Sequence, residues 1–60
     1  MHQADVEIPR LIDEIQRLNR EAIAAFERDE KEAGIRALAS ETEAITRLQA
    51  IVREDASKGE

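Results

Sequence analysis

The side chains in this chain that could act in catalysis are few, and they are not arranged as a catalytic set. The hydroxyl groups belong to Ser40, Thr42, Thr46 and Ser57, and the single histidine is His2. A hydroxyl nucleophile needs a positioned base within hydrogen-bond reach, and none of the four has a histidine near it in the sequence. We therefore predict that the protein is not an enzyme.

Acidic residues are numerous, but their spacing does not predict acid–base or metal chemistry. Neighbours such as Asp13 and Glu14, or Glu41 and Glu43, do not face each other on a helix. One histidine without cysteine cannot build a zinc site. The sequence contains neither a glycine-rich phosphate loop nor the Glu-x-x-His motif of di-iron bundles. We expect no metal and no cofactor.

The composition favours helix, and the length of the chain limits how large a hydrophobic core it can bury. Of its 60 residues, 42% are hydrophobic, and 9 Lys+Arg against 14 Asp+Glu give a net charge of −5. Ala, Glu, Arg, Leu and Ile dominate, which are residues that lose little side-chain freedom in a helix. A single domain over residues 1–60 without disulfides buries too little surface to be stable alone. We therefore expect either a homo-oligomer, most simply a dimer, or an obligate protein partner.

Targeting signals are not visible in the sequence. No apolar run approaches the roughly 20 residues of a membrane span, and no segment has the pattern of a signal peptide. We expect a cytoplasmic protein that does not bind membranes.

Apolar residues at alternating steps of three and four predict a first helix over about 9–28. Pro9 suits the first turn of a helix, where its missing N–H is not needed. Residues 1–5 show no such period and are expected to be flexible. The stripe consists of Ile8, Leu11, Ile15, Leu18, Ala22 and Ala25.

The apolar phase breaks in residues 27–32, where all side chains are charged. Asp29 followed by Glu32 indicates a new helix start, with Asp29 as the N-terminal cap. This places a turn at about 28–30, a second helix at about 30–55, and a flexible tail at 56–60. The second helix carries apolar residues over more than one face.

These features predict an all-α fold, an antiparallel two-helix hairpin that dimerises into a four-helix bundle. A single long helix in a coiled coil is the alternative, because Gly34 alone is a weak helix breaker. Small residues beside the turn, such as Ala22, Ala25 and Gly34, would let the two helices approach closely. The predicted association interface is Leu11, Ile15, Leu18, Leu38, Ile45, Leu48 and Val52.

Four residues interrupt or extend this pattern. Asn19 lies within the first stripe, at about the same distance from the turn as Glu41 and Thr42. A carboxylate among apolar residues is costly unless it is paired, so these three residues would form a buried polar cluster. The alternative is that Glu41 reaches solvent at the rim. Phe26, the only aromatic residue, is expected to belong to the core beside the turn.

A basic stripe gives a second hypothesis, because Arg10, Arg17, Arg20 and Arg28 share the outer side of the first helix. Phosphate contacts supply most of the affinity for nucleic acid, and the net charge of −5 opposes them. Binding to nucleic acid is therefore the less favoured prediction.

The segment AFERDEKEA at 25–33 resembles the inter-helix turn of tetratricopeptide-type hairpins, although one unit cannot build a solenoid. In size, acidity and expected hairpin form, the chain is also similar to Rop-type RNA-binding hairpin dimers and to small secretion co-chaperones. This similarity is one of shape and assigns no role to any residue.

The sequence as a whole predicts a small, non-enzymatic, self-associating helical protein that acts as a protein-binding adaptor, regulator or co-chaperone. The excess of apolar residues on the second helix is the basis for this prediction. Two alternatives stay open. One is a Rop-like nucleic-acid-binding regulator that uses the first-helix arginines. The other is an acidic decoy or antitoxin-type inhibitor of a basic partner.

Overall fold

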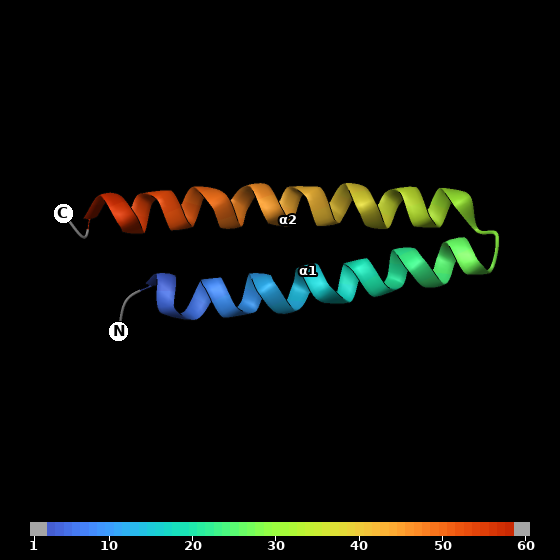
Figure 1. Cartoon of the computed structure of the whole chain (residues 1–60), viewed down its shortest axis with the longest axis horizontal. Helices are drawn as coiled ribbons and strands as arrows, with labels where there is room; N and C mark the ends of the chain where they lie inside the picture. Colours follow the sequence, from blue (N-terminus) through green and yellow to red (C-terminus); the bar gives the residue numbers. More distant parts are fainter. Residues whose placement is uncertain (1–2, 59–60) are drawn as a thin grey trace.

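The chain folds into two antiparallel helices joined by a short turn (Figure 1). The computed structural model describes residues 3–58, with α1 at Gln3–Glu27 and α2 at Lys31–Lys58. The two helices lie side by side along a hairpin 47 Å long, 16 Å wide and 10 Å thick. The predicted all-α hairpin is confirmed, and the single continuous helix is excluded.

The first helix begins six residues earlier than predicted, at Gln3, and Pro9 lies inside it rather than in its first turn. Pro9 has no N–H to donate to the carbonyl of Asp5, so one helical hydrogen bond is missing there. Ala4 is buried against α2, and this packing favours the extra turns. The prediction of a helix start at Pro9 was therefore wrong.

The second helix also extends further than predicted, to Lys58 instead of residue 55. The segments predicted as flexible, 1–5 and 56–60, are helical where the structure describes them, at residues 3–5 and 56–58. Residues 1–2, which include His2, and 59–60 lie outside the described residues.

The turn is at the predicted place, but Asp29 ends the first helix instead of capping the second. Its φ of 61° is left-handed. The Glu30 N–H donates to the Ala25 carbonyl at 2.8 Å, and the Asp29 N–H donates to the Phe26 carbonyl at 3.0 Å. These two bonds define a Schellman motif with Asp29 at the C′ position. Glu30 occupies the N-cap position of α2, because its carbonyl accepts the Gly34 N–H at 3.0 Å.

The core between the helices is built almost entirely from small side chains. Ala22 and Ala25 are only 1% and 3% exposed, and the Phe26 ring lies over Gly34, where an added Cβ would lie 2.7 Å from ring carbons. The helices therefore approach closely near the turn, as the small residues predicted. The buried residues are Ala4, Leu11, Ala22, Ala25, Gly34 and Ala44. Leu11 is the only one of them with a large side chain.

Candidate association surface

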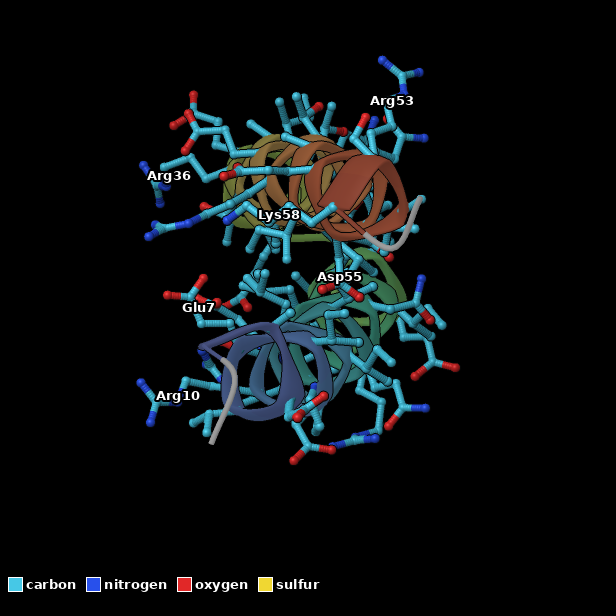
Figure 2. The ribbon with its side chains drawn as sticks, turned by 90° about the vertical axis from the view of Figure 1, so that its left-hand side faces the viewer. Glu7, Arg10, Arg36, Arg53, Asp55 and Lys58 are labelled. Carbon is cyan, nitrogen blue, oxygen red and sulfur yellow. The ribbon has the colours of Figure 1, made fainter. Side chains whose placement is uncertain are left out.

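The hairpin has two broad faces of different character. Glu7, Arg10 and Arg36 lie on one side of the pair of helices (Figure 2). A helix turns by about 100° per residue, so Ile12 lies about 200° round α1 from Arg10. Ile45 lies nine residues, or two and a half turns, from Arg36 on α2. Both isoleucines therefore lie on the side opposite the charged residues.

We call this opposite side the apolar face. Its large side chains are 37–51% exposed, although all are hydrophobic. Ile35 is more exposed and lies at its edge, while Val6 is close to Arg10 around α1 and is not part of it. The apolar face consists of Ile12, Ile23 and Phe26 from α1 and Leu38, Ile45 and Val52 from α2.

A seven-residue spacing runs along both helices of the apolar face. On α1 it joins Ile12, Asn19 and Phe26, and on α2 it joins Leu38, Ile45 and Val52. Seven-residue repeats keep one side of a helix facing a partner helix in left-handed supercoiled bundles. The hairpin therefore presents two parallel rows of the kind that pack against further helices.

The rows on the two helices lie level with each other. On the charged side, Leu11 and Glu14 line the same shallow groove as Ser40, Glu43, Ala44 and Arg47, which places this part of α1 beside residues 40–47 of α2. Ile12 of α1 therefore lies at the level of Ile45 of α2. One heptad closer to the turn, Asn19 lies at the level of Leu38.

The predicted association residues divide between the hairpin seam and the apolar face. Leu11 is buried in the seam, and Ile15, Leu18 and Leu48 are half-buried along it. Only Leu38, Ile45 and Val52 are on the apolar face. Leu11 is covered by α2 of the same chain and is therefore a seam residue of the hairpin.

Sequence reasoning missed the α1 half of the apolar face. Phe26 was predicted as a core residue, and Ile12 and Ile23 were not assigned to the association interface, but each of the three is more than 40% exposed. For Phe26 the prediction of a core residue holds only for the part of the ring that lies over Gly34. The seven-residue spacing from Ile12 to Phe26 was the signal in the sequence that could have identified this row.

The predicted buried polar cluster of Asn19, Glu41 and Thr42 is not formed within the hairpin. Asn19 and Thr42 are exposed, Glu41 is half-buried, and no polar side chain is buried among residues 4–58. The Thr42 hydroxyl donates to the Leu38 carbonyl of its own helix at 3.0 Å. The helices are rotated so that small and aliphatic residues fill the seam, which leaves Asn19 on the apolar face.

The arginine stripe of the first helix is exposed, as predicted, but acidic residues interrupt it. The Arg17 guanidinium pairs with the Glu21 carboxylate at 2.8 Å, and that of Arg28 pairs with Glu30 at 2.9 Å. Arg10, Arg17 and Arg20 line a shallow depression together with Asp13, Glu14 and Gln16. The stripe is thus a surface of mixed charge.

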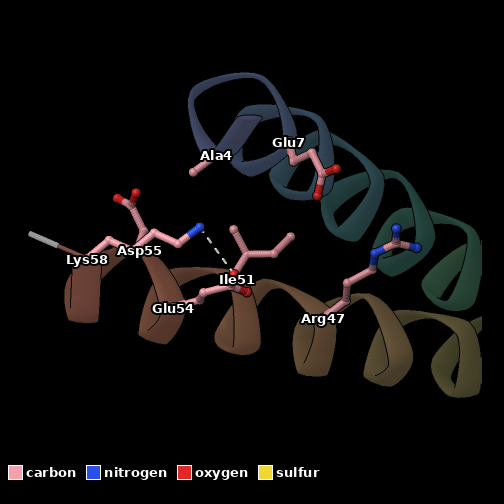
Figure 3. Close-up of a pocket in the computed structure, with 7 residues that line it drawn as sticks. All are labelled: Ala4, Glu7, Arg47, Ile51, Glu54, Asp55 and Lys58. Carbon is pink, nitrogen blue, oxygen red and sulfur yellow. Dashed lines mark ion pairs between the residues drawn. The ribbon is translucent and has the colours of Figure 1, made fainter. Parts of the chain in front are cut away.

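A small recess lies at the open end of the hairpin, between the start of α1 and the end of α2 (Figure 3). Its volume is about 260 Å³. Ala4 and Ile51 are its apolar residues, and the Lys58 ammonium pairs with the Glu54 carboxylate at 3.3 Å. The other charged residues that line it are Glu7, Arg47 and Asp55. Because acids and bases alternate around it, the recess favours neither anions nor cations.

Residues 3–58 contain no group of three or more side chains that could hold a metal ion. Neither α1 nor α2 is apolar enough over its length to cross a membrane.

Comparisons with known proteins give no relative. No protein-family model, no curated protein and no solved structure is significantly similar to this chain.

Proposed function

We propose that this protein is a small non-enzymatic association module, a helical hairpin that pairs with a second copy of itself through the apolar face. The resulting four-helix bundle would serve as a protein-binding adaptor, regulator or co-chaperone. The observation that carries the proposal is the apolar face itself, on which six large hydrophobic side chains are exposed, whereas Leu11 is the one large side chain in the buried class among residues 4–58.

The free energy available from burying apolar surface favours association over a free hairpin. Burial of apolar surface is worth roughly 25 cal/mol per Å², and the hairpin buries mainly alanine side chains. The six large side chains of the apolar face stay 37–51% exposed in the free hairpin, and this remaining surface gains the energy only when the face is covered. Association is therefore the step at which this chain acquires an ordinary hydrophobic core.

The dimensions of the apolar face suit a second copy of the chain. The broad side of the whole hairpin measures 47 Å by 16 Å, an outline of roughly 750 Å² that is of the same order as the roughly 800 Å² per partner of a stable interface. A second hairpin supplies a face of the same length and the same hydrophobic character. Four helices around a shared core are a common stable arrangement.

Substitution of Ile45 by Asp tests this proposal. A carboxylate in the centre of the apolar face would have to be buried without a partner, so we expect I45D to lose the dimer in light scattering at micromolar concentration. Because the isolated hairpin has little core, we also expect its helical circular dichroism to fall.

Val6 provides the matched control, because it is 41% exposed against 37% for Ile45 but lies outside the apolar face. V6D should therefore keep the dimer and its helical signal. A wild-type chain that stays monomeric at all accessible concentrations would refute the proposal, and so would an I45D variant that remains dimeric.

A further inference from the structure

We infer that the two hairpins of the dimer lie with their turns at the same end, so that α1 packs against α2 of the partner subunit. This inference rests on the proposed self-association and specifies its geometry. A two-fold axis in the plane of the interface can run along the bundle or across it. The first choice places the turns together, and the second places them at opposite ends.

Each seven-residue row ends in a charged residue. The α1 row extends back from Ile12 to Asp5, and the α2 row extends back from Leu38 to Lys31. At the other end of each row, the last apolar residue is followed directly by a charge, Glu27 after Phe26 and Arg53 after Val52. Each row therefore begins at a charged residue, and a further charge follows its last apolar residue about 100° round the helix, at the outer edge of the apolar face.

In the same-end arrangement, opposite charges meet. With α1 antiparallel to α2 of the partner subunit, Ile12 faces Ile45 of the partner subunit. One heptad towards the turn, Asn19 faces Leu38 of the partner subunit. At the ends of these rows, Asp5 then lies beside Arg53 of the partner subunit, and Glu27 lies beside Lys31 of the partner subunit.

In the opposite-end arrangement, like charges meet. There α1 packs against α1 of the partner subunit, which brings Glu27 beside Asp5 of the partner subunit. Likewise α2 packs against α2 of the partner subunit and brings Lys31 beside Arg53 of the partner subunit. Like charges in contact across an interface disfavour that arrangement, and opposite charges fix orientation.

These four charged side chains are available for such contacts. Within residues 3–58, no ion pair of the hairpin engages Asp5, Glu27, Lys31 or Arg53. All four are exposed. Each pair is worth little alone, but the two-fold axis doubles every pair, so the difference between the two arrangements is the sum of several attractions and repulsions.

Asn19 supports the same orientation. In the same-end arrangement the two Asn19 side chains occupy one layer of the bundle, so its polar groups are gathered at a single level. In the opposite-end arrangement Asn19 faces Ile12 of the partner subunit, and its amide has no polar neighbour in the row. A polar residue within an apolar seam is a known determinant of register and orientation in helical bundles.

Distances between spin labels measure the orientation directly. The chain has no cysteine, so R28C carries a single label at the turn. Helices in a bundle lie 8–10 Å apart, so turns at the same end give a label distance of about 30 Å or less. Turns at opposite ends give a distance approaching the 47 Å length of the hairpin. E43C, a label near the middle of α2, is the control and should give a similar distance in both arrangements.

Charge reversal gives an independent test, because the two arrangements predict opposite changes in the affinity of the dimer. In the same-end dimer, E27K places two lysines together and should weaken the dimer several-fold, whereas the double variant E27K/K31E should restore it. In the opposite-end dimer, E27K would instead pair with Asp5 of the partner subunit and strengthen association. E14K makes the same change of charge on the charged face and should leave the dissociation constant unchanged.

The outcomes separate the orientation from the self-association. A dimer with a turn-to-turn distance above 40 Å, or one tightened by E27K, overturns the same-end arrangement and leaves the proposed function intact. Labelled chains that show no dipolar coupling and sediment as monomers refute the proposed function itself. A short distance at residue 28 together with weakening by E27K supports both.

Discussion

At Asp29, a residue with a Cβ occupies the left-handed conformation that most helices give to glycine at the C′ position. Its φ of 61° costs an L-residue free energy that glycine does not lose, although aspartate tolerates it better than most. Its charge lies between the end of α1 and the start of α2, where the two helix dipoles act on it in opposite senses. Backbone strain is therefore the dominant energetic effect at this position.

We predict that D29G stabilises the hairpin by about 0.5–1 kcal/mol, because glycine removes the Cβ from the left-handed residue. Urea unfolding of the two proteins at equal concentration measures the difference. D29V, which puts a β-branched side chain at the same φ, should shift the midpoint in the other direction. Equal midpoints for the glycine and valine variants would show that the turn does not hold this conformation in solution.

At the scale of the helices, the sequence predicted which segments are helical and where they turn. The charged segment at 27–32 interrupts the apolar phase, and the structure places the turn inside it. The role of Asp29 could not be decided from the sequence, because aspartate serves both as an N-cap and as a left-handed residue. The start of α1 was missed because Pro9 is a strong local signal, whereas the burial of Ala4 depends on α2.

The assignment of apolar residues to the seam or to the apolar face was only partly predictable. The seam residues and the apolar-face residues both repeat every seven residues. The sequence pattern therefore does not indicate which of these two sets faces the other helix of the chain. Close contact between the helices near the turn determines which set lies in the seam, because the small residues Ala22, Ala25 and Gly34 can be buried there. That contact fixes the rotation of both helices and leaves Ile12 and Ile45 exposed.

Pro9 gives a prediction that belongs to this scale. In the interior of α1 it removes a hydrogen bond to the Asp5 carbonyl, and a proline there is less favourable than alanine by up to about 3 kcal/mol. Since Pro9 is exposed, P9A should stabilise the protein by about 1–3 kcal/mol and slow amide exchange in residues 3–8. Q16A, an exposed change later in α1, should have little effect, and a P9A variant no more stable than Q16A would contradict the helical state of this segment.

For the whole molecule, folding and association should be one process. The hairpin is flat, 10 Å thick, and among residues 4–58 Leu11 is its only large side chain in the buried class, which is a small core to set against the entropy of ordering the chain. Further apolar surface lies on the apolar face, and the proposed dimer would bury it on association. The stability of such a protein depends on its concentration, since the unfolded state consists of two separate chains.

We therefore predict that the midpoint of thermal unfolding rises with protein concentration. A tenfold increase adds about 1.4 kcal/mol to the stability of the dimer, which corresponds to a rise of roughly 5 °C for a molecule of this size. Circular dichroism melts over a hundredfold range of concentration measure the effect, and V6D should show the same slope as the wild type. A cooperative melt at the same temperature throughout that range would mean that the single hairpin is stable on its own, and the apolar face would then need another explanation.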